Sequence, residues 1–491
     1  MKNIPQSGRE EYIMNFTHRI RNLVTGMTWH AIFVLGMAKP GQSKERYGFN
    51  SLEQPDNLPI MEPFKERLAN DLVGNIKWKN NTNDLQKEMK QEIRKMDRSL
   101  DLYIAGDKST NYYKVSHKEH SKHQDRDITK DYRKSSKEEF ANVTKDDKKI
   151  AESLNIADRV FRTSEKQSFL TYKDHKDDFK NTKASRLLNP CKQELGKVSK
   201  QILVKVVTFV RNATKLLQFK NSISVIQWFN QIENKQKHTF IQFDICEFYS
   251  SISKKLLSDA VEWAETMTEI GRDKREIIFH VRKTYLFNKG QPWVKKKDPN
   301  FDIAMGSFDS AEVTDLVGLF LLSKLQGLGV NVGLYRDDGL VLSPFSPKET
   351  DNVKKKITKI FGEHGLRVTI KANMKVVDFL DVTLDLMTGL HRPYIKPNTK
   401  PLYVHAQSNH PKSILKNIPA NVNKRLSILS SNEEVFNSST KLHQEALKAS
   451  GYTHKLKFEQ QDLNSMNKNK KKTRSRRIHW FNPPWDMNVA T

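Results

Sequence analysis

Apolar positions between about residue 151 and residue 390 follow two different periods, which predicts a domain that mixes strands and helices. Four runs have the character of strands: HTFIQFDI, VGLYR, GLVLS and VVDFLDVTLDL. Three runs have helical spacing: KKLLSDAVEWAETM, SAEVTDLVGLFLLSKLQ and KETDNVKKKITKIFGEHG. The strands bracket the helices without a regular βαβ rhythm, so we expect an α+β fold with a largely antiparallel sheet.

The segments on either side of this domain have different patterns. Residues 117–149 are so rich in Lys, Asp, Ser and His that we expect a linker or mobile surface region there. A capping-box spacing between Ser431 and Glu434 predicts a helix that ends at Gly451. The chain is therefore divided into an α-rich N-terminal extension with a charged linker, the mixed domain, a helical region and a basic tail: 1–150, 151–390, 391–460 and 461–491.

The positive charge points to a polyanionic partner. The 491 residues carry 84 Lys and Arg against 57 Asp and Glu, a net charge of +27, and nucleic acid is the leading candidate. A membrane surface is the second candidate, but no run reaches the roughly 18 apolar residues of a spanning helix. Met1 is followed by polar residues where a secretory signal is apolar, and Cys191 and Cys246 form no disulfide framework. We expect an intracellular protein of the nucleus or cytoplasm. The basic run NKNKKKTRSRR (467–477) suits nuclear localisation, nucleic-acid binding or a solvated tail equally well.

Three carboxylates interrupt apolar runs. Asp244 ends a strand-like run, and Asp337 and Asp338 stand between two others in GLYRDDGLVL. An Asp-Gly pair in such a setting is most often only a hairpin turn. However, an unpaired carboxylate at the end of a buried strand is costly, and several together repel one another unless cations neutralise them. If the hairpin lies beside the Asp244 strand, the three acids could hold the two divalent cations that polymerases and nucleases use for phosphoryl displacement.

Two further motifs carry polar chemistry. In MGSFDSAEV, Gly306 predicts a turn into a helix near Ser310, where the backbone could approach a flat ligand such as a base pair. Upstream, a hairpin is expected to carry Lys173, Lys176 and Arg186, whose cations suit a triphosphate. An exposed basic hairpin without a ligand is the plainer interpretation of the same residues.

Taken in order, these motifs resemble a reverse transcriptase, and most closely that of Penelope-like retroelements. TYKDHK and RLLNP resemble the fingers elements of that family. FDICEFY, MGSFDSAEV and YRDD resemble its palm motifs, and FLDV resembles its primer grip. AGDK (105–108) is similar to an N-terminal signature of these elements, and 394–419 to their segment after the palm. The resemblance covers roughly residues 102–450. It implies a right-hand polymerase with fingers and palm in 151–390 and a thumb-like region in 391–460.

The activity that the resemblance implies is RNA-directed DNA synthesis with two Mg²⁺ ions, or Mn²⁺. An RNA template, a DNA primer and deoxynucleoside triphosphates are the implied partners, with no membrane and with protein partners unknown. Asp244 and Asp337 match the metal-bridging acids, and Asp338 matches the supporting acid. Tyr249 matches the aromatic gate that excludes the 2′-hydroxyl of a ribonucleotide.

The resemblance also implies contacts with the nucleotide and the primer. Lys173 and Arg186 match residues that contact the triphosphate. Gly306 and Ser310 match the loop that lies along the template and the incoming base, and Phe379 and Leu380 match the primer grip.

Some positions depart from the family pattern. Arg336 fills the variable position of YRDD, where a small or apolar residue is commoner, and Met305 and Ala311 stand where glutamine and proline are frequent. Many Penelope-like proteins continue into a GIY-YIG endonuclease. This chain stops without one, so target cutting would come from elsewhere or the copy is truncated.

Two other functions account for part of the pattern. A catalytically inactive, basic nucleic-acid-binding remnant of a truncated retroelement would need only the positive charge. A two-metal nuclease would use the three acids but leaves Tyr249 and Gly306 unexplained.

Overall fold

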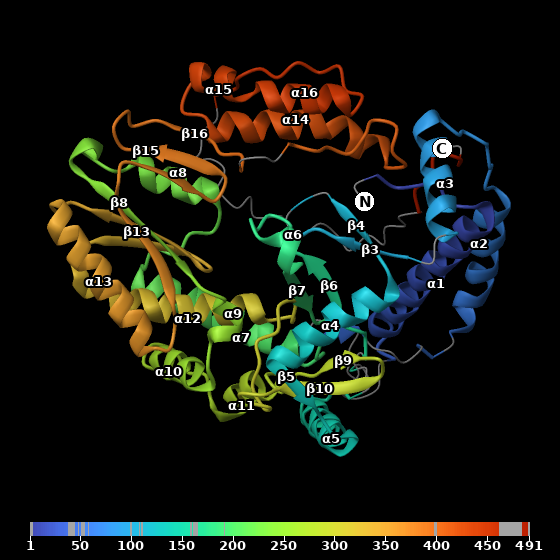
Figure 1. The fold of residues 1–491 in the computed structure, drawn as a ribbon. Coiled ribbons are helices and arrows are strands. Elements are labelled where there is room, and N and C mark those ends of the chain that lie inside the picture. Colours follow the sequence, from blue (N-terminus) through green and yellow to red (C-terminus); the bar gives the residue numbers. More distant parts are fainter. Residues whose placement is uncertain are drawn as a thin grey trace. The chain divides into compact units, whose positions relative to one another are not determined.

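A computed structural model describes residues 3–37, 45–47, 49–50, 55–56, 58–98, 101–107, 109, 111–157, 160, 165–190, 192–396, 400–460 and 484–489. The chain forms two compact units (Figure 1). The central unit comprises Glu45–Phe49 and Leu100–Leu390, and the terminal unit comprises Met1–Lys44, Asn50–Ser99 and His391–Thr491. The predicted basic run 467–477 and Cys191 lie outside the described residues.

A four-stranded antiparallel sheet organises the central unit. Its order is β11-β12-β8-β13. The strands are β8 (Thr239–Ile245), β11 (Asn331–Tyr335), β12 (Asp338–Ser343) and β13 (Val368–Met374). The expected strands over β8, β11 and β12 are therefore confirmed, as is the antiparallel pairing, and β13 is an edge strand that was not predicted.

Helices cover one face of this sheet. They are α7 (Gly196–Thr214), α10 (Lys254–Glu265), α12 (Ser310–Leu325) and α13 (Pro347–Glu363), of which α10, α12 and α13 lie along β8 and β13 in Figure 1. Alternate residues of β8, namely Ile241, Phe243 and Ile245, are buried in one apolar core with side chains of these helices. Because side chains alternate along a strand, Gln242 and Asp244 belong to the opposite face.

Smaller sheets and helices complete the central unit. The hairpins are β3 (Leu102–Ala105) with β4 (Tyr112–Val115), β6 (Phe169–Tyr172) with β7 (Ser185–Leu188), and β14 (Val376–Phe379) with β15 (Val382–Asp385). A three-stranded sheet has the order β5 (Tyr132–Lys134), β10 (Gln291–Lys295), β9 (Leu286–Asn288). The remaining elements are α4 (His117–Asp131), α5 (Lys137–Ser153), α6 (Phe179–Thr182), α8 (Ser222–Asn230), α9 (Phe248–Ser251), α11 (Arg272–His280), β1 (Glu45–Arg46), and the 3-10 turns η2 (Lys235–Lys237) and η3 (Gln326–Leu328).

The charged linker expected over residues 117–149 was wrong. Helices α4 and α5 occupy this segment, and they begin at Ser116 and Ser136, whose side chains accept hydrogen bonds from the backbone in the first turn. The charged residues lie mostly on outward faces, while a few apolar residues such as Ile128 and Ala151 are buried. The composition suggested disorder because each helix buries only a narrow apolar stripe.

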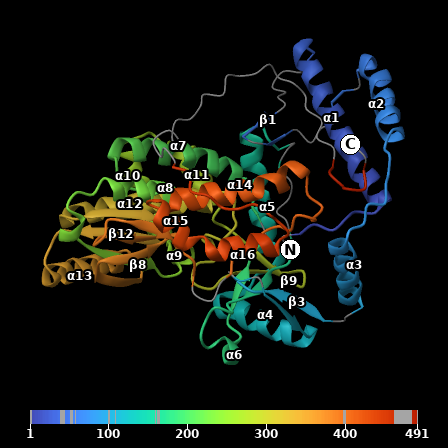
Figure 2. The same ribbon diagram turned by 90° about the horizontal axis from the view of Figure 1, so that it is seen from above.

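The terminal unit joins both ends of the chain. It contains α1 (Arg9–Val34), η1 (Pro59–Met61), α2 (Glu62–Gly74), α3 (Asp84–Asp97), β16 (His391–Pro393), α14 (Lys412–Leu429), α15 (Glu433–Ser439) and α16 (Lys441–Ala449). The boundary between the units falls within β2 (Phe49–Asn50). The backbone N–H of Ser7 donates to Asp486, and the Asn409 side chain donates to the same carboxylate, at 2.8 and 2.9 Å. Helices α14 and α16 lie side by side in Figures 1 and 2.

The helix expected from Ser431 is divided in two. Asn432, not Ser431, accepts the capping hydrogen bond, from the N–H of Val435 at 2.9 Å. The Ser431 hydroxyl instead bonds to the backbone of His391. The chain then breaks between α15 and α16 at Thr440. Among the described residues, no helix combines the length and apolar character needed to cross a membrane.

Gly339 is expected to tolerate no side chain. It pairs directly with Phe243, and a Cβ at this position would lie 2.0 Å from the buried Phe243 ring, which packs on Phe361. Gly339→Ala should therefore lower the free energy of unfolding by about 1–3 kcal/mol, the usual cost of overpacking a core. Urea denaturation measures this, with Gly327→Ala as control because no atom lies within 4 Å of its Cβ position. Equal losses in the two variants would contradict the packing argument.

Candidate active site

The sheet register places two of the predicted acids side by side. Asp338, the first residue of β12, pairs directly with Asp244 on β8. Residues directly opposite each other in an antiparallel pair point to the same face, here the face away from the buried helices. Asp244 is exposed and Asp338 is half-buried. Two carboxylates distant in sequence thus share one face of the sheet, at its accessible end.

The third acid, Asp337, lies in the turn of the same hairpin. Arg336 and Asp337 connect β11 to β12, with Tyr335 paired to Asp338. The backbone N–H of Ile245 donates to the Asp337 carbonyl at 2.9 Å, which fastens the turn to the end of β8. The hairpin interpretation of GLYRDDGLVL is confirmed, and the same hairpin lies against the Asp244 strand.

The acids fit divalent cations in their chemistry but are not arranged as a ready site. Carboxylate oxygens are the donors that Mg²⁺ and Mn²⁺ take. Among the residues described by the structure, no group of three or more His, Cys, Asp and Glu side chains is positioned to hold a metal ion. Like charges repel one another in the absence of a cation. Metal binding by Asp244, Asp337 and Asp338 therefore stays a prediction.

Tyr249 follows the Asp244 strand on a short helix. After β8 the backbone turns at Glu247, whose φ of 49° is left-handed, and enters α9. Phe248 is buried in the main core, as its apolar neighbours predict, whereas Tyr249 is only half-buried at the edge of that core. Tyr249 is thus the aromatic residue of this motif that keeps surface available to a ligand.

The Gly306 loop has an open tip and a fixed end. Gly306 has a φ of 95°, and no atom lies within 4 Å of its Cβ position, so its backbone is accessible. Ser310 is buried, and its hydroxyl donates to the Ser307 carbonyl at 3.2 Å. Ser310 therefore shapes the loop from within, while Gly306 offers the surface along which a base pair could lie.

Two residues that the sequence did not single out hold this loop. The carboxylate of Asp309 pairs with the guanidinium of Arg282, and each side chain is only 1% exposed. The Ser199 hydroxyl on α7 also donates to Asp309, at 2.5 Å. Next to it, the Phe308 ring packs near Gly196 and lies under the ammonium of Lys197 at 5.2 Å. The only signal in the sequence was an aspartate immediately before a helix.

The predicted hairpin of the fingers is confirmed. Arg186 on β7 pairs with Thr171 on β6, and Lys173 follows β6 with its N–H bonded to the Ala184 carbonyl at 2.8 Å. The Arg186 guanidinium lies 3.3 Å from the carboxylate of Asp107, in the AGDK motif. Lys108, also in this motif, lies outside the described residues. Arg186 is thus already paired with an anion.

The β14–β15 hairpin carries the predicted primer grip. Phe379 is 1% exposed and packs against the Phe219 ring, so it is a core residue. Leu380 lies in the turn with a left-handed φ of 56°. The Gln242 side chain donates to the Asp378 carbonyl at 2.8 Å, which attaches the hairpin to β8 on the face that carries Asp244.

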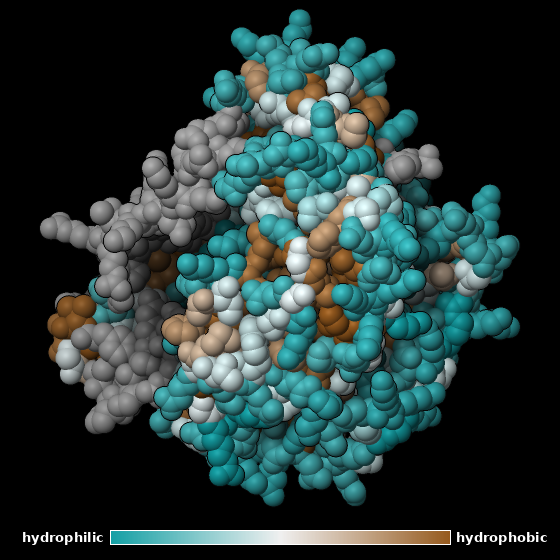
Figure 3. Space-filling view, turned by 90° about the vertical axis from the view of Figure 1, so that its left-hand side faces the viewer, coloured by the Kyte–Doolittle hydropathy of each residue, from teal (hydrophilic) through white to brown (hydrophobic). Residues whose placement is uncertain are grey.

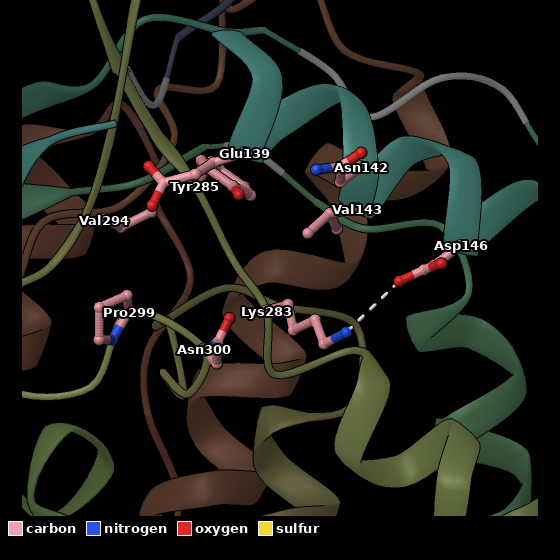
Figure 4. A pocket seen from close by; sticks show the side chains of 9 residues that line it. All are labelled: Glu139, Asn142, Val143, Asp146, Lys283, Tyr285, Val294, Pro299 and Asn300. Carbon is pink, nitrogen blue, oxygen red and sulfur yellow. Dashed lines mark ion pairs between the residues drawn. The ribbon is translucent and has the colours of Figure 1, made fainter. Parts of the chain in front are cut away.

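The pocket drawn in Figure 4 is separate from these motifs. It is lined by residues of α5, such as Asp146, and by residues around β9 and β10, including Lys283. These two side chains form an ion pair at 3.6 Å. None of the predicted site residues lines this pocket.

Several solved structures are similar to this chain. The telomerase from Candida albicans in complex with a TWJ fragment of telomeric RNA has 12% identity and a TM-score of 0.51, over 81% of this chain and 68% of its own. Telomerase from Candida tropicalis has 10% identity and a TM-score of 0.47, over 90% and 86% of the two chains. The RNA-dependent RNA polymerase of a human picobirnavirus has 12% identity and a TM-score of 0.37, over 67% and 70%.

Sequence comparisons add one local match. The model of the animal helix-turn-helix domain matches residues 402–462, which include α14, α15 and α16. No curated protein matches the chain. The α+β architecture and the likeness to the Candida albicans telomerase together show a right-hand polymerase fold with a helical N-terminal region.

Proposed function

We propose that the chain is an RNA-directed DNA polymerase of a Penelope-like retroelement, which adds deoxynucleotides to a primer 3′-hydroxyl on an RNA template. The observation that carries the proposal is the direct pairing of Asp338 with Asp244 on the face of the sheet away from the helices. The net charge of +27 suits a nucleic-acid duplex. In Figure 3, hydrophilic residues make up most of the coloured surface and surround a hydrophobic patch near its centre.

Asp244, Asp337 and Asp338 would hold Mg²⁺, or Mn²⁺ in its place. Bound there, the ions would lower the pKa of the attacking hydroxyl and neutralise charge on the departing pyrophosphate. The hydrogen bond from the Ile245 N–H to the Asp337 carbonyl holds the turn at the end of β8. The three acids would have to lie close together there to share the ions. The open backbone at Gly306 leaves room for the new base pair.

The fingers and the β14–β15 hairpin would position the substrates. Lys173 and Arg186 are proposed to bind the triphosphate, and a nucleotide would have to displace Asp107 from Arg186 because the two are already paired. Phe379 would support the primer grip from the core, since its ring is buried. Leu380, which lies in the turn, is the member of the pair that we propose to meet the primer.

Primer extension tests the proposal. We expect the chain to extend a DNA primer on an RNA template with deoxynucleotides and Mg²⁺, with binding that weakens steeply as salt rises. Tight, salt-dependent RNA binding without incorporation in Mg²⁺ or Mn²⁺ would support the inactive binding remnant instead. Cleavage of the template without extension would support a nuclease.

Tyr249→Ala is expected to weaken the discrimination against ribonucleotides. The half-buried ring lies just beyond the Asp244 strand, and its removal would leave room for a 2′-hydroxyl. The ratio of kcat/KM for deoxynucleotides to that for ribonucleotides should fall by about tenfold or more. Tyr249→Phe keeps the ring and should keep the ratio. An unchanged ratio in Tyr249→Ala would remove the proposed role of this residue.

A further inference from the structure

Arg336, the unusual residue of the YRDD motif, directs its side chain at α12. Its guanidinium donates to the Ala311 carbonyl at 2.5 Å and to the Thr314 hydroxyl at 3.3 Å. It also pairs with the carboxylate of Asp315 at 3.0 Å. All three partners belong to the beginning of α12, the helix that follows the Gly306 loop.

The guanidinium of Arg336 is therefore paired with a carboxylate, which it shares with a second arginine. Asp315 also lies 3.8 Å from Arg211 on α7, whose guanidinium is bound in turn by the Gln218 side chain. Burial raises the pKa of Asp315, and the two arginines act against that shift. Since Arg336 and Asp315 are both half-buried, the pair is shielded from the full screening of water. The guanidinium of Arg336 thus binds residues of α12, and not the acids next to Arg336 in sequence.

The backbone of Arg336 has a strained conformation, which the contacts of its side chain help to hold. Its φ of 56° is left-handed, a conformation that costs a residue with a Cβ and that persists where surrounding contacts hold it. The next residue, Asp337, is fixed on its other side by the bond from Ile245. The turn is therefore held from β8 by its backbone and from α12 by the Arg336 side chain.

We propose that Arg336 is a positioning residue that ties the turn bearing Asp337 and Asp338 to the start of α12, so that the acids and the Gly306 loop keep a fixed separation. The inference rests on the proposed function, in which both parts meet the same incoming nucleotide. A displacement of about 1 Å in such a site can cost up to a hundredfold in rate. A role in binding the phosphates of the primer is the alternative, and it would lower the affinity for nucleic acid.

The test compares Arg336→Asn with Arg211→Gln. Asn adopts the left-handed conformation readily and is too short to reach α12, so the first variant removes the attachment without straining the turn. Arg211→Gln removes the other cation beside Asp315 and leaves the turn untouched. The measurements are kcat and KM in primer extension, affinity for an RNA–DNA duplex, and hydrogen exchange of the backbone amides from Tyr335 to Gly339.

We expect Arg336→Asn to lower kcat by about tenfold or more and to speed amide exchange in the turn, with duplex affinity unchanged. Arg211→Gln should keep kcat within about twofold and leave exchange in the turn as in the parent chain. Unchanged kcat and exchange in Arg336→Asn, or a loss of duplex affinity, would overturn the inference. If the parent chain incorporates no nucleotide, the proposed function fails, and exchange in the turn still decides whether Arg336 holds it.

Discussion

Asp337→Asn is expected to lower Mg²⁺-dependent incorporation of deoxynucleotides by on the order of a thousandfold. Asparagine has the same shape and suits a turn, so the β11–β12 hairpin should persist. The substitution removes the negative charge and one strong oxygen donor at the position proposed to bridge the cations. Asp244→Asn should have an effect of similar size, because the register places Asp244 directly opposite Asp338, the neighbour of Asp337. Primer extension on an RNA template measures both losses.

The matched control is Asp351→Asn, an exposed acid on α13 in the same unit. Its activity should equal that of the parent chain. Affinity for the RNA–DNA duplex should stay unchanged in all three variants, since the net charge of +27 changes by a single unit. Full activity in Asp337→Asn would remove the proposed role of this acid.

Arg282→Met is expected to destabilise the fold by about 3–5 kcal/mol. The change leaves the Asp309 carboxylate, which is 1% exposed, without its cation in the interior of the central unit. The Ser199 hydroxyl alone cannot replace the lost charge. Because Asp309 lies at the end of the Gly306 loop, the loss should also raise the KM for deoxynucleotides. Chemical denaturation monitored by circular dichroism measures the change in stability.

Two comparisons separate a buried pair from a general sensitivity to charge. Adding Asp309→Asn to Arg282→Met should recover part of the loss, because the uncompensated charge is gone. Lys255→Met removes a pair with Asp259 in which the lysine is 82% exposed, and it should change stability by less than about 1 kcal/mol. Equal losses from Lys255→Met and Arg282→Met would contradict the account of the buried pair.

The strands that carry the acids could be predicted because their apolar faces are complete. In β8, Ile241, Phe243 and Ile245 alternate with the polar Gln242 and Asp244, and the hairpin of β11 and β12 has a clear turn signal. Strand β13 could not be predicted from the sequence, because VTIKANM is an edge strand with no fully buried residue. The stretch over α4 and α5 was misjudged for a related reason, since its charged surface outweighs a narrow buried stripe.

Contacts between side chains that are distant in sequence could not be predicted from the sequence alone. Asp309 stands in the MGSFDSAEV motif, but nothing in the sequence marks Arg282, 27 residues earlier, as its partner. Arg336 could be identified as unusual, but the direction of a long side chain depends on what packs around it. Its pairing with Asp315 follows from the position of α12 beside the turn, which no local pattern encodes. The same holds for Asp107 and Arg186.

Binding of Mn²⁺ is the most direct test of the claim that Asp244 and Asp337 serve one site. It can be measured by electron paramagnetic resonance on a complex with an RNA template, a DNA primer that lacks its 3′-hydroxyl, and the next deoxynucleotide. The account predicts bound Mn²⁺ in the parent complex and loss of most of that signal in both Asp244→Asn and Asp337→Asn. Undiminished Mn²⁺ binding in either variant would contradict a shared metal site.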